Sequence, residues 1–102
     1  MSQPLKPEKL LNVIELTYKE VGLPITHIST LAYNDFENEL TRAIQHLIDK
    51  DFEKLMHLLY RIDVNEQKVK MAFGLEKEVA REIALLIINR EQQKVITRAK
   101  YK

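Results

Sequence analysis

Four side chains that could bind a metal ion recur at helical spacing in the middle of the chain. His46, Asp49, Glu53 and His57 are separated by three, four and four residues, so one continuous helix would place all four on the same face. Helical bundles bind pairs of iron or manganese ions through such inward-facing carboxylates and imidazoles. That chemistry uses a Glu-x-x-His pair, and zinc peptidases use His-Glu-x-x-His, but the sequence contains neither motif. We therefore expect a solvated helix face here, without a metal or another cofactor.

Nucleophilic catalysis and phosphate binding have equally little support. The chain has no cysteine, and the hydroxyl residues near His27 lack the glycine-flanked turn that presents a nucleophilic serine. Its only two glycines, Gly22 and Gly74, lie too far apart to form a phosphate-binding loop. The sequence thus predicts a protein that is not an enzyme.

The most pronounced charge feature is a basic C-terminal segment. The formal net charge is only +1, but bases outnumber acids beyond residue 89 and acids outnumber bases before it. Bases spaced by four on a helix form one positive stripe that can meet phosphates, although the same positions also complement the helix dipole. Binding to nucleic acid is therefore the alternative function. The candidate polyanion-binding residues are Arg90, Lys94, Arg98, Lys100 and Lys102.

A second nucleic-acid hypothesis is a helix-turn-helix over residues 52–73. Its second helix would display Gln67, Lys68 and Lys70, which are types that contact bases and phosphates. The turn lacks glycine, however, and Glu66 would face the DNA. We expect an ordinary helical corner instead.

Apolar residues at spacings of three and four predict an all-α bundle. Whether residues 35–62 form one helix or two stays open, because the apolar phase continues past Ile48 whereas Asp51 is a good N-cap. Asn34 with Glu37, and Asp63 with Glu66, also have the spacing of helix-capping pairs. The predicted helices span about 8–21, 35–49, 52–62, 64–72 and 76–99.

Two segments depart from simple amphipathic helices. Residues 25–33 are rich in β-branched side chains and are compatible with an extended crossover, a short strand or a frayed helical turn; we favour a crossover that buries Ile25, Ile28 and Leu31. Residues 83–88 are apolar on nearly every side of the last helix, so this helix is either the centre of the bundle or a subunit contact. In the second case the candidate self-association residues are Ile83, Leu85, Leu86 and Ile88.

A dense block at 58–64 (Leu-Leu-Tyr-Arg-Ile-Asp-Val) is followed by Asn65 and Glu66, and later by 89–94 (Asn-Arg-Glu-Gln-Gln-Lys) and Thr97-Arg98. These segments, in the C-terminal half, resemble a family of short, uncharacterised bacterial all-helical proteins. Since that family has no assigned activity, the resemblance implies a helical fold and no functional residues.

Within the same block, physical chemistry favours structural roles. Tyr60 is expected to be half-buried at a helix end with its hydroxyl outward, and Asp63 to accept a hydrogen bond from Arg61 or from a backbone N–H.

Together these observations predict a single domain over residues 1–102, a compact bundle of four or five helices located in the cytoplasm and not in a membrane. The longest apolar run is far shorter than a membrane span. The predicted function is a non-enzymatic interaction or scaffold protein that binds a protein partner or forms a homodimer.

Overall fold

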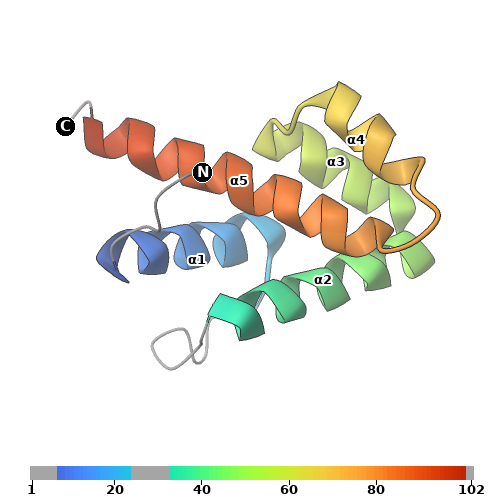
Figure 1. The fold of residues 1–102 in the computed structure, drawn as a ribbon, viewed down its shortest axis with the longest axis horizontal. Coiled ribbons are helices and arrows are strands. Elements are labelled where there is room, and N and C mark those ends of the chain that lie inside the picture. The colour runs from blue at the N-terminus through green and yellow to red at the C-terminus, as the bar shows by residue number, and fades with distance from the viewer. Residues whose placement is uncertain (1–6, 24–32, 101–102) are drawn as a thin grey trace.

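Five helices, and no strand, make up the part of the chain that the structure, a computed structural model, describes: residues 7–23 and 33–100 (Figure 1). The predicted all-α class is confirmed. The helices are α1 (Pro7–Val21), α2 (Tyr33–Lys50), α3 (Phe52–Ile62), α4 (Glu66–Phe73) and α5 (Val79–Lys100). The predicted crossover over 25–33, including Ile25, Ile28 and Leu31, lies outside the described residues apart from Tyr33, which begins α2.

The last helix is the centre of the bundle. α5 packs against each of the other four helices, with α1 and α2 below it and the α3–α4 pair above it in the view of Figure 1. This explains why residues 83–88 are apolar on every side. Ile83 and Ile88 are buried within the chain and are therefore unavailable to a second copy, which corrects the predicted self-association surface. Leu85 and Leu86 are half-buried.

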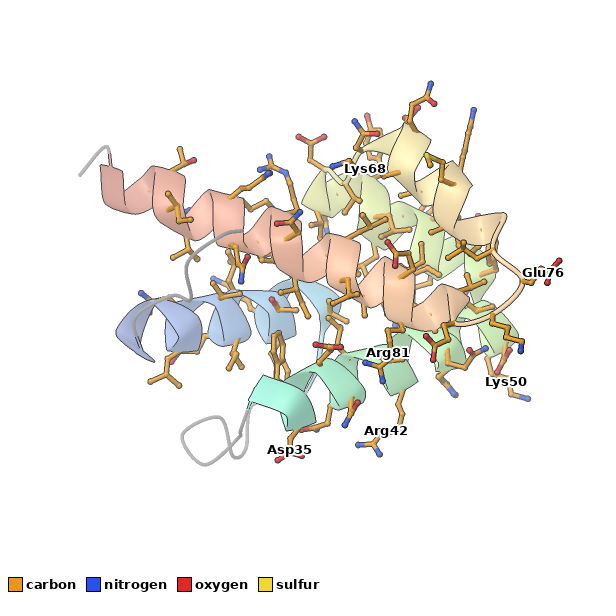
Figure 2. The ribbon with its side chains drawn as sticks, in the orientation of Figure 1. Asp35, Arg42, Lys50, Lys68, Glu76 and Arg81 are labelled. Atoms are coloured by element: carbon orange, nitrogen blue, oxygen red, sulfur yellow. The ribbon has the colours of Figure 1, made fainter. Side chains whose placement is uncertain are left out.

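Apolar side chains from all five helices form one core around α5. On the α1–α2 side, the rings of Tyr18 and Phe36 lie 5.9 Å apart between centroids. Burial and, next, the carboxylate of Glu39 raise the pKa of Tyr18 to about 12, so its hydroxyl stays protonated. Arg81 reaches from α5 to α2 (Figure 2) and donates to Glu37 Oε1 at 2.6 Å.

Asp51 separates α2 from α3, so residues 35–62 form two helices. Its backbone is extended (φ −155°, ψ 69°), and its Oδ1 accepts a hydrogen bond from the Lys54 N–H at 3.1 Å. This is the N-cap that the sequence offered as one of two alternatives. The apolar phase was a poor guide because both helices turn an apolar face to the same core.

Asp51→Ala is expected to destabilise the fold by about 1 kcal/mol, since it leaves the first turn of α3 without its side-chain acceptor. Urea denaturation measures the loss. Asp49→Ala is the matched control: Asp49 is exposed, and its Oδ1 accepts only from Gln45 on the surface of α2. An equal effect of the two substitutions would show that the cap does not stabilise α3.

The corner between α3 and α4 differs from the sequence prediction. Asp63 does not begin a helix but ends α3 in the left-handed conformation (φ 70°), and its N–H donates to the carbonyls of Leu59 and Tyr60. Asn65 is the N-cap of α4, accepting from the Lys68 N–H at 3.1 Å. The predicted pair of Asp63 with Glu66 was wrong because capping spacing recurs by chance in a polar turn.

The remaining helix ends agree in part. Gly22 has φ 87° and donates to the Tyr18 carbonyl, as a left-handed C-cap should. Asn34 lies inside α2 rather than before it, and Glu37 binds Arg81 instead of closing a capping pair. The last helix begins at Val79, after Glu78 with φ 59°, three residues later than predicted.

Candidate functional site

Large apolar side chains gather on the outside of the α3–α4 corner. Five of the seven exposed large apolar side chains in the described residues come from α3, α4 or the turn after α4. Three of them follow one another at four-residue intervals along α3, which places them on one side of that helix. We call this set the α3–α4 face: Phe52, Met56, Tyr60, Met71 and Leu75.

A groove of about 470 Å³ lies between α3 and α4 at this face. Its buried floor is formed by Leu59, Val64 and Val69. Met56 and Tyr60 line it as well but stay exposed, and Tyr60 has 83% of its surface in solvent. The groove therefore has an apolar floor, and the solvent-exposed side chain of Tyr60 lies at its edge.

Charged residues border the groove on both sides of the turn. Asp63 lies at the end of α3, and Glu66 and Lys70 stand one turn apart on α4. Asp63 is paired with Arg90. Neither Glu66 nor Lys70 forms an ion pair within residues 7–23 and 33–100. The border thus carries one acid and one base that are free to meet charges on another molecule.

The far end of the corner is held by aromatic packing. Phe52 at the start of α3 and Phe73 at the end of α4 meet edge to face, with ring centroids 5.3 Å apart. The groove lining does not include this ring pair; along α3 it runs from Met56 to Asp63, which is about two helical turns.

Sequence reasoning missed this face and assigned Tyr60 a half-buried structural role, which is wrong. Phe52 and Met56 have the same helical spacing as core residues of α3, so periodicity alone does not mark them as exposed. The signal was present, however: Leu55, Leu58, Leu59 and Ile62 are buried and by themselves complete the core-facing pattern of one helix. The exposed stripe of Phe52, Met56 and Tyr60 is therefore not needed to cover the core.

A buried polar cluster joins α1 to α5. Glu91 is fully buried, and the Lys94 Nζ lies 3.3 Å from its Oε1 and 3.0 Å from Glu20 Oε2. Burial, together with the negative charge of Glu20, raises the pKa of Glu91 to about 7, although Lys94 acts in the opposite direction. Because no solvent reaches Glu91 in the folded chain, the cluster is an internal contact between α1 and α5.

Two residues of the predicted basic stripe, Arg90 and Lys94, form contacts inside the molecule. Arg90 donates from Nε to the Asp63 carbonyl at 3.0 Å and from Nη2 to Asp63 Oδ2 at 3.3 Å, while Lys94 belongs to the α1–α5 cluster. Arg98 is exposed. Lys100 ends α5 but its side chain is not described, and Lys102 lies outside the described residues. Two of the five predicted polyanion-binding residues therefore bind this chain's own acids.

Arg61, like Arg90, supports the end of a helix. Its Nη2 donates to the Glu20 carbonyl at the end of α1, at 2.8 Å. Asp63 accepts from Arg90 and not from Arg61, which corrects the partner named from the sequence. These two arginines connect α3 to its neighbours and place the α3–α4 corner on the bundle.

The remaining sequence candidates are spread over the surface. His46 and Asp49 are exposed on α2, and Glu53 and His57 are exposed on α3. Within the described ranges, no group of three or more such side chains could hold a metal ion. The break at Asp51 ends the shared face on which that hypothesis depended. His27 lies outside the described residues.

The side chains that the helix-turn-helix hypothesis needs are exposed, but the helix that carries them is short. Gln67, Lys68 and Lys70 are exposed on α4, and Lys68 stands at the start of that helix (Figure 2). α4 has only eight residues, about two turns, and Glu66 lies in its first turn.

In the described residues, the protein is thus an all-α bundle of five helices with exposed apolar side chains at the α3–α4 corner. The chain matches no protein-family model, no curated protein and no solved structure. The resemblance to short bacterial helical proteins therefore stays an expectation. None of the helices within the described residues is both long and apolar enough to cross a membrane.

Proposed function

We propose that this chain is a non-enzymatic interaction module that binds a protein through the α3–α4 face. The observation that carries the proposal is Tyr60, which is 83% exposed beside an apolar groove. A solvated tyrosine at such a groove gains contact area only when another molecule covers it. A cytoplasmic location, predicted from the sequence, belongs to the same proposal.

The composition of the face supports this function. Tyrosine is enriched among residues that dominate binding energy, because it buries a large ring at small entropic cost while its hydroxyl finds a polar partner. The flexible thioethers of Met56 and Met71 adapt to irregular surfaces. Met56 and Tyr60 line the groove together, and contiguous exposed apolar surface marks interaction sites.

The alternatives have weaker support. Nucleic-acid binding through α5 would need Arg90 and Lys94 to leave Asp63 and Glu20, and catalysis by Glu91 would need access to a buried carboxyl. Neither alternative explains why apolar side chains are exposed on α3 and α4.

Site-specific photo-crosslinking tests the proposal. A benzophenone amino acid replaces Tyr60 or Met71, and Arg42 in the control; Arg42 is exposed on α2 and points away from α3 and α4 (Figure 2). After illumination in cells that make the chain at its natural level, we expect adducts of defined mass from the first two positions only. Equal adducts at Arg42, or none at Tyr60, would contradict the proposal.

A second measurement excludes chance capture. The protein in the Tyr60 adduct, identified by mass spectrometry, should bind the purified chain, and Tyr60→Ser should weaken that binding by about tenfold or more. Since Tyr60 is exposed, the variant should keep the circular dichroism and melting temperature of the parent. Unchanged affinity would remove the α3–α4 face as the docking surface.

A further inference from the structure

We propose that the occupant of the α3–α4 face is a second copy of the same chain, with the two α4 helices antiparallel about a twofold axis. This inference rests on the proposed function and names its partner. The sequence placed self-association at residues 83–88, but two of the four residues named there are buried. The contact proposed here lies instead at the α3–α4 corner.

The argument begins with the free charges at the groove. Glu66 and Lys70 lie four residues apart, so they project from the same side of α4, and both line the groove. When a second α4 lies antiparallel against the first, Lys70 of each copy stands opposite Glu66 of the other. Two Glu66–Lys70 ion pairs then form between the copies, whereas a parallel arrangement would bring like charges together.

The apolar residues fit the same symmetry. In a twofold interface one surface patch meets itself, so each contact occurs twice. Tyr60 stands at the edge of a groove that its own ring does not fill, since the ring is 83% exposed. In the twofold arrangement, each Tyr60 approaches the groove of the other copy and covers Met56 and the floor around Val69. The same surface on each copy thus contributes a groove and the Tyr60 ring that enters the groove of the other copy.

The groove also has the dimensions for such a partner. Its lining runs along α3 from Met56 to Asp63, about two helical turns. α4 itself has eight residues, about two turns. A helix of matching length, with matching charges, is therefore present on every copy of the chain.

Charge reversal provides the test. Sedimentation velocity and light scattering on the purified full chain should show a concentration-dependent species of twice the monomer mass. Glu66→Lys and Lys70→Glu should each raise the dimer dissociation constant by about tenfold or more, because like charges then face each other. The double variant Glu66→Lys with Lys70→Glu should restore dimerisation, since the charges are exchanged but still complementary.

Lys68→Glu is the matched control. It makes the same charge change on the same helix, but Lys68 projects from the side of α4 opposite Glu66 and Lys70 and does not line the groove. It should leave the dissociation constant unchanged. Circular dichroism and thermal melting of all four variants check that each folds, which the exposure of these positions favours.

Each outcome decides the inference. A strict monomer at high micromolar concentration, a dimer insensitive to the single reversals, or a double variant that stays monomeric would overturn it. If the chain is monomeric while the Tyr60 position crosslinks a different protein in cells, the proposed function stands and the second copy is excluded. If neither experiment detects an association at the α3–α4 face, both proposals fail.

Discussion

Replacing Lys94 with methionine is expected to destabilise the folded chain by about 2–3 kcal/mol at pH 8. The substitution leaves the carboxylates of Glu20 and Glu91 facing each other without the cation that now lies 3.0 and 3.3 Å from them. Removing one partner of a buried ion pair costs about 3–5 kcal/mol. We expect less here because the Lys94 side chain keeps 17% of its surface exposed.

Urea denaturation at pH 8 and at pH 5 measures this effect. The loss of unfolding free energy caused by Lys94→Met should be smaller at pH 5, because Glu91 is protonated there and carries no charge to repel Glu20. Lys54→Met is the control, since Lys54 is exposed on α3 and its ammonium forms no ion pair in the described residues. If Lys94→Met were as mild as Lys54→Met at pH 8, the α1–α5 cluster would contribute nothing to stability.

Replacing Glu91 with glutamine should have the opposite sign, stabilising the chain by about 2–3 kcal/mol at pH 8. Folding raises the pKa of Glu91 to about 7 from an ordinary value of 4.5, chiefly by burial, and each pKa unit corresponds to about 1.4 kcal/mol. The contribution of this group to stability is therefore greatest below pH 4.5. It is lost as the pH rises, and the loss is complete above about pH 7.

Glutamine has nearly the same shape but no charge, and its amide oxygen can still accept from Lys94. The difference in unfolding free energy between Glu91→Gln and the parent should thus be near zero at pH 4, grow between about pH 4.5 and pH 7, and stay level to pH 8. Denaturation at four pH values measures it. A difference that does not change with pH would mean that packing, and not ionisation, is responsible. Opposite signs for Lys94→Met and Glu91→Gln at pH 8 are the signature of a buried carboxylate held by one cation.

The helical fold could be predicted because local sequence and tertiary packing agree along most of the chain. Ile14 and Tyr18 on α1, for example, lie four residues apart and are both buried. The central position of α5 was also foreseeable, since a helix that is apolar on every side needs neighbours on every side. What periodicity could not decide was whether those neighbours belong to the same chain.

The break at Asp51 and the corner at Asp63 show a different limit. Each turn offers several polar residues that can cap a helix, so spacing alone does not choose among them. Arg90 binds Asp63 from 27 positions away, and no local rule contains that contact. Spacing alone therefore proposed the wrong capping residue for α4.

The candidate site was the least predictable part. Whether Phe52, Met56 and Tyr60 face the core or solvent depends on which side of α3 the bundle covers, and this follows from the packing of α3 against α1, α2 and α5. Likewise, Arg90 and Lys94 are basic residues on a helix in either case. Only the position of Asp63 and Glu20 across the interface shows that they are internal partners.

The central position of α5 also governs how the chain folds as it is made. α5 is the last helix, yet every other helix packs on it, and the ion pair of Lys94 with Glu20 spans 74 positions. Ribosomes add about 5–20 residues per second, so the 22 residues of α5 follow α4 over about 1–4 s. During that interval the apolar faces of α1 to α4 have no common partner. The bundle can therefore close only after α5 has been made, however early the other four helices leave the ribosome.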